Sequence, residues 1–225
     1  MNFKSVLTIA AAVSTSALFS SCSNLPGGSG LASYHAYDRP TKLPKNPNNV
    51  KVKVSLSKQR VYVMEGSEIL LAMPVSVGAP ATPTHAGNYT IFNKEAKHRA
   101  STHGYAYSGS QTKQTFLDKK PAGWSFKGTP MPYWCEFSPN YGFHTGWIKH
   151  QPCTHGCIRM HENLSPKFFR LVKVGTPVNI SYSQPEDATY GNIPLPPDSG
   201  PLTDYPGTMY TSDGYFSQHT TPKYD

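Results

Sequence analysis

The chain has 225 residues, 37% of them hydrophobic, and carries 21 Lys and Arg against 13 Asp and Glu, for a net charge of +8. This length allows one sizeable domain with additional segments. The positive charge favours anionic partners, but the basic residues occur singly or in pairs, which argues against a nucleic-acid-binding surface.

The N-terminal segment predicts export. A short positive start, Met1–Lys4, precedes the uncharged apolar stretch Ser5–Phe19, which is shorter than the roughly 20 residues that span a bilayer. We therefore predict a signal peptide over residues 1–21. The run Leu18–Cys22 resembles the lipobox of bacterial lipoproteins. This implies a lipid on Cys22 that holds the protein to a membrane in the periplasm or cell envelope; a signal-peptidase cut nearby is the alternative.

The next segment changes from linker to strands. Residues 22–49 are rich in Gly, Ser, Pro and Asn, and predict a flexible linker after the anchor. From Val50 onward, valines alternate with lysines as in a β-strand. Short loops predict antiparallel hairpins. Further strands are predicted at residues 59–64, 69–77, 89–92, 131–137 and 177–180.

One helix is predicted, from Ser165-Pro166 to Gly175, because proline suits the first helical position. Residues 183–225 are rich in Pro, Gly, Tyr and Ser, and predict an irregular tail without a packed core. The expected folded unit is therefore residues 50–182. We predict a mainly β fold, a sandwich or partial barrel with one or two short helices.

The run Thr154–Arg159, which reads Thr-His-Gly-Cys-Ile-Arg, is the most informative part of the chain, and His144 stands thirteen positions before Cys157. A cysteine nucleophile needs an imidazole to take the thiol proton and backbone N–H groups to face the developing oxyanion. Gly156 lets the backbone turn directly before the thiol. Cys157 and His144 are therefore the predicted nucleophile and base.

This run, preceded by Gly142-Phe143-His144, resembles the YkuD-type L,D-transpeptidase catalytic domain, in which a His is followed by a spacer and Ser/Thr-His-Gly-Cys. The resemblance continues in chain order over about residues 50–182. The spacer after His144 is shorter than in many members, which affects the shape of the covering loop and hence substrate selectivity. The segments that also match are Leu56–Val63, Val75–Gly87, Met131–Trp134 and Val174–Val178.

The resemblance implies catalytic roles for four residues. Cys157 is the nucleophile, His144 the general base, and His155 positions the loop, although spacing alone leaves an exchange of the two histidines open. Gly156 and Cys157 supply the oxyanion N–H groups. Thr145 follows His144 and offers an oxygen that orients the imidazole.

Three residues are predicted to contact substrate: Arg159, Tyr133 and Thr145. Arg159 is the expected carboxylate clamp, because a guanidinium binds a carboxylate through two parallel hydrogen bonds. An internal salt bridge that shapes the loop is the alternative role for Arg159. Tyr133 is expected to line the cleft, and a place in the core is its alternative.

Two cysteines remain after Cys22 and Cys157 are assigned. Because an exported protein permits disulfides, we expect a bridge between Cys135 and Cys153 that restrains the segment before Cys157, with two reduced thiols as the alternative.

The family implies that the partner is the peptide stem of peptidoglycan, that 3→3 crosslinks form, and that neither cofactor nor metal is needed. Water as acceptor would give carboxypeptidase activity. The rivals are a papain-like cysteine hydrolase, whose Cys would precede its His, and a non-enzymatic wall-binding lipoprotein. A third rival is a zinc site, for which the ligand spacing is poor. Its ligands would be Cys153, His155, Cys157 and His161.

Overall fold

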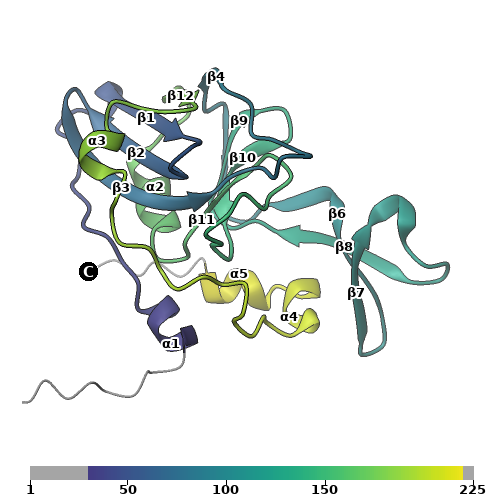
Figure 1. The fold of residues 1–225 in the computed structure, drawn as a ribbon. Helices are drawn as coiled ribbons and strands as arrows, with labels where there is room; N and C mark the ends of the chain where they lie inside the picture. The colour runs from purple at the N-terminus through teal and green to yellow at the C-terminus, as the bar shows by residue number, and fades with distance from the viewer. Residues whose placement is uncertain (1–29, 220–225) are drawn as a thin grey trace, which may run out of the picture.

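The computed structural model describes residues 30–219 and is mainly β, which confirms the predicted fold class (Figure 1). The predicted signal peptide and Cys22 lie outside the described residues. No helix among residues 30–219 has both the length and the apolar character needed to cross a membrane.

The strands form two sheets. The large sheet contains β1 (Val50–Ser55), β2 (Arg60–Glu65), β3 (Glu68–Ser76), β4 (Gly87–Thr90), β5 (Asn93–Glu95), β9 (Trp134–Ser138), β10 (Tyr141–Thr145), β11 (Ile158–Met160) and β12 (Pro177–Ser181). Its order is β4-β12-β1-β2-β3-β11-β10-β9-β5. The small sheet, ordered β7-β6-β8, contains β6 (Arg99–Ser108), β7 (Gln111–Phe116) and β8 (Ser125–Pro130).

Five short helices complete the described chain. They are α1 (Gly30–His35), α2 (Ser165–Leu171), α3 (Asp187–Tyr190), α4 (Gly207–Thr211) and α5 (Gly214–His219), with 3-10 turns at Pro47–Asn49 and Leu117–Lys119. The predicted helix is α2, which ends earlier than expected because Val172 already has extended backbone angles.

The large sheet curls into a half-barrel. The rings of Tyr89 near its first edge and Phe137 near its last edge lie 5.3 Å apart, so the two ends of the strand order approach each other. Most neighbouring strands are antiparallel, as the hairpin signals predicted, but β1 pairs with β12, and β10 with β11, in parallel. A parallel pair needs a crossover, here residues 146–157, and that crossover carries the predicted nucleophile.

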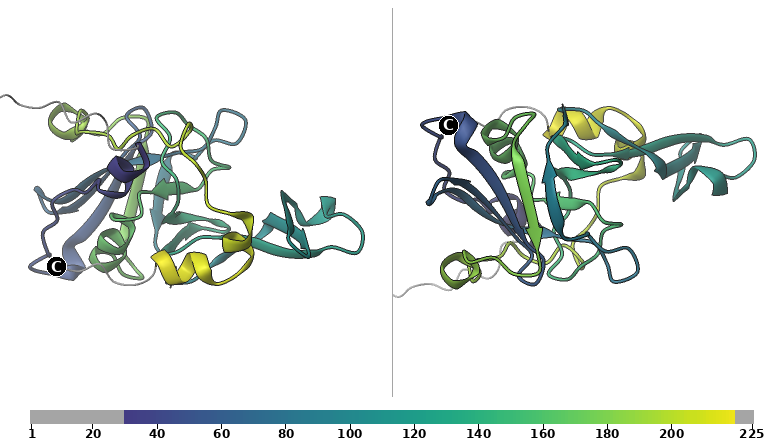
Figure 2. Two further views of the ribbon diagram at one scale, coloured as in Figure 1. Left: turned by 90° about the horizontal axis from the view of Figure 1, so that it is seen from below. Right: turned by 90° about the horizontal axis from the view of Figure 1, so that it is seen from above.

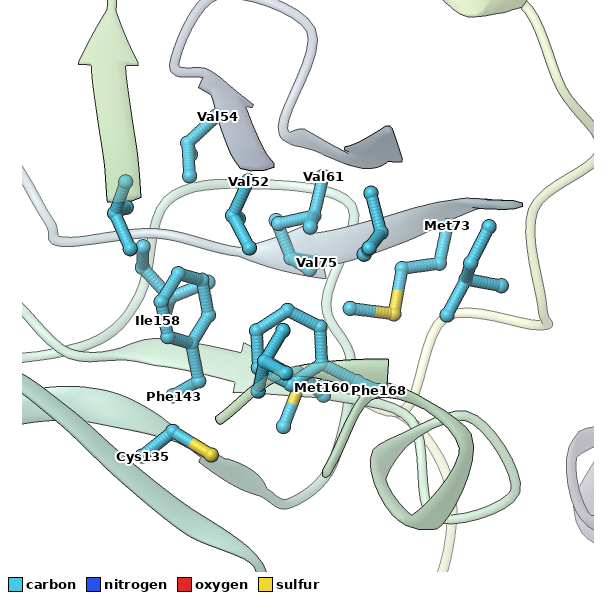
Figure 3. Packing of buried hydrophobic residues seen from close by; sticks show 14 of the residues in the cluster. Val52, Val54, Val61, Met73, Val75, Cys135, Phe143, Ile158, Met160 and Phe168 are labelled. Atoms are coloured by element: carbon cyan, nitrogen blue, oxygen red, sulfur yellow. The ribbon is translucent and has the colours of Figure 1, made fainter. Parts of the chain in front are cut away.

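The core of the half-barrel is aliphatic and aromatic (Figure 3). Valines of β1 and β2 face Phe143 of β10 and Phe168 of α2, whose rings are 4.7 Å apart. Phe168 is fully buried, and burial of such a side chain stabilises the fold by roughly 1.5–3 kcal/mol. Helix α2 therefore closes the open side of the curled sheet.

The small sheet, residues 99–130, projects from the half-barrel as an arm (Figures 1 and 2). Its strands are rich in Ser, Thr, Gln and Lys, and most of their side chains are exposed or half-buried. The arm was not among the predicted strands, because polar strands that bury little apolar surface lack a clear hydrophobic period.

Residues 30–49 and 183–219, together called the wrap, pack against the half-barrel and the arm. Tyr34 is 1% exposed, and Tyr210, Tyr215 and Phe216 are buried as well. Residues 30–49 therefore pack on the fold where a flexible linker was expected, and residues 183–219 bury side chains although much of their backbone is irregular. The physical reason is that tyrosine rings, rather than aliphatic side chains, supply the buried surface.

Candidate active site

Strand register brings the predicted catalytic residues to one face of the sheet. Phe143 pairs with Ile158, and His144 with Arg159, in the parallel β10–β11 ladder. Since Phe143 and Ile158 face the core, alternation places His144 and Arg159 on the opposite face. Cys157, directly before β11, shares that face with them.

The turn before Cys157 is tightly specified. Gly156 has φ +107°, and a Cβ there would lie 2.4 Å from a ring carbon of Tyr141, so glycine is required on both counts. The Thr154 hydroxyl donates to the Cys157 carbonyl at 2.6 Å and accepts from the Gly156 N–H at 3.2 Å. These contacts fix the backbone that presents the thiol.

A second loop, residues 78–84, holds this turn from outside. The Thr84 hydroxyl donates to the Gly156 carbonyl at 2.8 Å and accepts from the Gly78 N–H at 2.9 Å. The Thr82 hydroxyl donates to the Thr154 carbonyl at 3.0 Å. Residues 78–84, which lie in a segment that resembles the family, therefore hold the turn that carries Cys157 in place.

The Cys157 side chain is half-buried and its thiol lies 3.8 Å from the carbonyl oxygen of Asn140. Burial raises the pKa of Cys157, against the lowering effects of a hydrogen bond from the Gly142 backbone and of the Arg159 charge. The thiol is therefore protonated at rest and needs a base before it can attack.

His144 is suited to be that base. It is 7% exposed, and its Nδ1 lies 2.8 Å from the Thr145 carbonyl oxygen. A carbonyl only accepts, so Nδ1 carries the proton and Nε2 keeps the lone pair. Burial, followed by the Arg159 charge, lowers the pKa of His144 to about 3. The imidazole is neutral near pH 7 and able to take a proton.

His155 occupies a different environment. Its side chain is exposed, with its ring 5.4 Å from the ring of His103 and 6.1 Å from that of Phe116, both on the arm. The geometry favours His144 over His155 as the base and places His155 between the nucleophile turn and the arm. The Gly156 N–H already donates to the Thr154 hydroxyl. Of the two predicted oxyanion donors, the backbone N–H of Cys157 is therefore the better candidate.

Arg159 forms no ion pair with Asp or Glu within residues 30–219. Its Nη1 donates to the Trp147 carbonyl at 3.2 Å and lies 3.8 Å from Cys153 Sγ. A Cβ on Gly146 would lie 2.7 Å from Cδ of Arg159, so Gly146 makes room for this side chain. The internal salt bridge considered for Arg159 is therefore absent within residues 30–219. No carboxylate among these residues forms an ion pair with the guanidinium of Arg159.

Two predicted substrate contacts are corrected. Tyr133 is 4% exposed, and its ring packs 5.4 Å from that of Phe169 beside the core. Its backbone has φ 57°, and its ring lies beside Phe169 of α2. The Thr145 side chain is 2% exposed, so only its carbonyl, which bonds His144, takes part in the site.

The predicted disulfide is also wrong, because Cys135 and Cys153 are free thiols. Cys135 is fully buried and points into the core (Figure 3). Cys153 lies beside Arg159 on the opposite face of the sheet. Burial raises the pKa of Cys135 to about 12, so this thiol is inert.

The zinc hypothesis finds no support in the geometry. No group of three or more His, Cys, Asp or Glu converges on a point in the part of the chain that the structure describes. His161 is fully buried and its Nε2 lies 2.9 Å from the Tyr34 carbonyl oxygen, away from the exposed His155.

Sequence reasoning missed the residues that support the site from other loops. Asn140, in the β9–β10 turn with φ 65°, directs its carbonyl at the thiol. Tyr141 packs against Gly156, and Thr84 holds the turn. The Pro139-Asn140 pair is a turn signal that would have located Asn140, since asparagine tolerates the left-handed region.

Comparison with known proteins gives one family. Residues 49–180 match the YkuD family model, described as the L,D-transpeptidase catalytic domain. No curated protein matches the chain.

Several solved structures are similar to the chain. An L,D-transpeptidase from Mycobacterium smegmatis is 18% identical, with 59% of this chain and 58% of that chain covered and a TM-score of 0.45. One from Stackebrandtia nassauensis is 21% identical, with 69% and 66% covered and a TM-score of 0.44. One from Xylanimonas cellulosilytica is 18% identical, with 69% and 70% covered and a TM-score of 0.46. The chain thus spans less than two thirds of the first two structures.

Proposed function

The chain belongs to the L,D-transpeptidase catalytic domain family, and from this premise we propose that it is a cysteine acyltransferase that acts on the peptide stems of peptidoglycan. The observation that carries the proposal is the hydrogen bond from Nδ1 of His144 to the Thr145 carbonyl, on the sheet face that also holds Cys157. This bond leaves Nε2 as a proton acceptor for the thiol.

The first half-reaction is acylation. Nε2 of His144 takes the Cys157 proton while Sγ attacks the carbonyl carbon that follows the L-centre of the stem's diamino acid. The tetrahedral oxyanion is stabilised by the Cys157 N–H. The proton then passes from His144 to the amine of the departing D-amino acid, the C–N bond breaks, and a thioester remains on Cys157.

The second half-reaction transfers the acyl group. The amine of a neighbouring stem attacks the thioester and gives its proton to His144, which returns it to the Cys157 sulfur as the C–S bond breaks. The product is a 3→3 crosslink. Water in place of the amine would give a carboxypeptidase.

Arg159 supports this proposal as the anchor for a substrate carboxylate. It has no acidic partner within residues 30–219, and the hydrogen bond from its Nη1 to the Trp147 carbonyl holds it on the catalytic face. A guanidinium without an internal counter-charge favours an anionic ligand. The +8 net charge would add attraction to an anionic wall polymer.

We also propose that the enzyme is exported and held at the membrane by a lipid on Cys22. The support is the charge and apolar pattern of residues 1–21 and the small residues before Cys22. The family model places the catalytic domain in residues 49–180, downstream of this segment.

The test is incubation of the chain with a disaccharide-tetrapeptide, followed by mass analysis of protein and products. We expect an acyl adduct on Cys157 and a 3→3 crosslinked dimer. Both should be lost in Cys157→Ala and kept in Cys153→Ala, a matched control because Cys153 is the other half-buried thiol. An adduct that survives Cys157→Ala, or no turnover by the reduced protein, would overturn the proposal.

A pH profile tests the role of His144 separately. Because its pKa is about 3, the single-turnover acylation rate should change by no more than about twofold between pH 7 and pH 5. A histidine base with the ordinary pKa of about 6.5 would lose roughly 25-fold over the same interval. A loss of that size by protein that is still folded at pH 5 would contradict the assignment.

A further inference from the structure

A cavity of about 210 Å³ lies outside the catalytic site, on the side of the sheet that the wrap covers. It is bounded by the β1–β2 hairpin, the end of β3, residues 148–150 and residues 191–195. A single water needs only about 10–15 Å³ of such space, so this cavity has room for a larger ligand. The proposed reaction uses none of its lining residues.

Arg60 is the buried charge of this cavity. It is 8% exposed and stands on the same face of β2 as Tyr62, opposite the core. Its Nη1 donates to the carbonyls of Lys58 at 2.7 Å and Gln59 at 3.0 Å. Its Nε is buried without a hydrogen-bond partner among residues 30–219, and no Asp or Glu there forms an ion pair with it.

The surroundings add charge of the same sign. Lys58 and Lys149 also line the cavity, and no lining residue is acidic. Two carboxylates whose partners belong to this region are already engaged in hydrogen bonds. Asp198 accepts from the N–H groups of His150 and Gly200. Asp187 accepts from the hydroxyls of Tyr62 at 2.7 Å and Ser55 at 2.8 Å.

A buried guanidinium that forms no ion pair is costly, and the more distant charge of Asp187 offsets only part of the burial that lowers the pKa of Arg60. A bound anion would reduce that cost further. With Nη1 committed to two carbonyls and Nε buried away from solvent, Nη2 is the terminal nitrogen of Arg60 that forms no hydrogen bond within residues 30–219 and is left to contact an oxyanion. Asn192 lines the same cavity and supplies a neutral amide donor.

We propose that this cavity binds a phosphoryl dianion through Arg60, with Lys58 and Lys149 as supporting charges. A phosphate monoester carries about −1.5 to −2 at pH 7, which matches three cations better than a single carboxylate does. The phosphoryl group comes either as a free small molecule or as part of a lipid headgroup. The site is independent of the proposed transpeptidation.

The cavity also touches the segment that leads to the nucleophile. The Lys149 N–H donates to the Ser76 hydroxyl at 2.9 Å, and the Gln59 side-chain amide donates to the His150 carbonyl at 3.1 Å. A ligand on Arg60 would therefore contact both the β1–β2 hairpin and residues 148–150.

The test is calorimetric titration of the full chain with inorganic phosphate at constant ionic strength. We expect saturable 1:1 binding that Arg60→Gln weakens about tenfold or more. Lys58→Gln and Lys149→Gln should each weaken it about two- to fivefold. Lys51→Gln, at an exposed lysine on β1 outside the cavity, is the matched control and should leave affinity unchanged.

The two lysine variants keep the test valid if Arg60→Gln fails to fold. Equal affinity of the Lys51, Lys58 and Lys149 variants, acetate binding tighter than phosphate, or no saturable binding would each overturn the proposal. Two further titrations identify the source of the phosphoryl group. Glycerol 3-phosphate that binds as phosphate does supports a free small molecule, whereas phosphatidic acid vesicles bound only when Lys58 and Lys149 are intact support a lipid headgroup.

Discussion

The half-barrel interior and the wrap bury their side chains by different means. The interior is filled by Val, Leu, Ile, Met and Phe side chains that carry no polar group. The wrap buries tyrosine and histidine rings whose polar atoms need partners, such as the Tyr34 hydroxyl on the Ile148 N–H at 2.9 Å. The interior should therefore respond to changes in volume, and the wrap to changes in protonation and hydrogen bonding.

The largest effect is expected in the interior. Phe168→Ala removes a fully buried ring that packs on Phe143, and should lower the free energy of unfolding by about 3–5 kcal/mol. Urea unfolding at pH 7 measures it. Phe92→Ala, at a ring that is 49% exposed, is the control and should cost much less. Equal losses would mean that Phe168 is not the core anchor that its burial indicates.

The second effect is acid sensitivity at His161, a buried residue outside the wrap whose Nε2 bonds the carbonyl of Tyr34 in the wrap. Burial lowers the pKa of His161 to about 4, although its neighbour Glu162 opposes the shift. The unfolded chain takes up this proton near pH 6.5 and the folded chain only near pH 4, so stability is lost as pH falls through that interval. From pH 7.5 to pH 4.0 the loss attributable to His161 is about 3 kcal/mol.

The structural reason is that both ring nitrogens of His161 are in use. Nε2 bonds the Tyr34 carbonyl, so it carries the proton, and Nδ1 accepts from the Asn163 N–H at 3.2 Å. A second proton, on Nδ1, would remove the lone pair that accepts the hydrogen bond from the Asn163 N–H. Unfolding of His161→Gln across the same pH range should show a weaker acid dependence by this amount. An unchanged dependence would assign the acid sensitivity to other groups.

The smallest effect concerns one hydroxyl of the wrap. Tyr34→Phe leaves the buried Ile148 N–H without its partner and should cost about 1–2 kcal/mol. Hydrogen exchange at the Ile148 amide should accelerate in the same variant. Tyr182→Phe, at a tyrosine that is 75% exposed, should change neither quantity. If the two variants behave alike, the wrap is not held by this bond.

The same contrast explains which parts of the fold were predictable. Val50, Val52 and Val54 alternate with lysines, so a single segment reveals both the strand and its buried face. The wrap offers no such period, because one tyrosine such as Tyr34 or Tyr210 is buried among small and polar neighbours. The burial of such a tyrosine becomes apparent only from its contacts with distant parts of the fold.

The site divides in the same way. Cys157 and His144 lie in local runs whose residue types already suggest the chemistry. Thr84 holds the Gly156 carbonyl from 72 positions away, a contact that needs the folded sheet. The disulfide prediction failed for a similar reason, since counting cysteines says nothing of the sheet face on which Cys135 and Cys153 lie.

The docking of α1 has a geometric consequence for the proposed lipid anchor at Cys22. A flexible linker over residues 22–49 would let the domain range about 95 Å from its anchor at full extension. Because Tyr34 of α1 is already buried against the fold, only the 11 residues 23–33 separate it from Cys22, which limits the span to about 42 Å. If Cys22 carries the lipid proposed above, the packed wrap would limit how far the catalytic face can lie from the membrane.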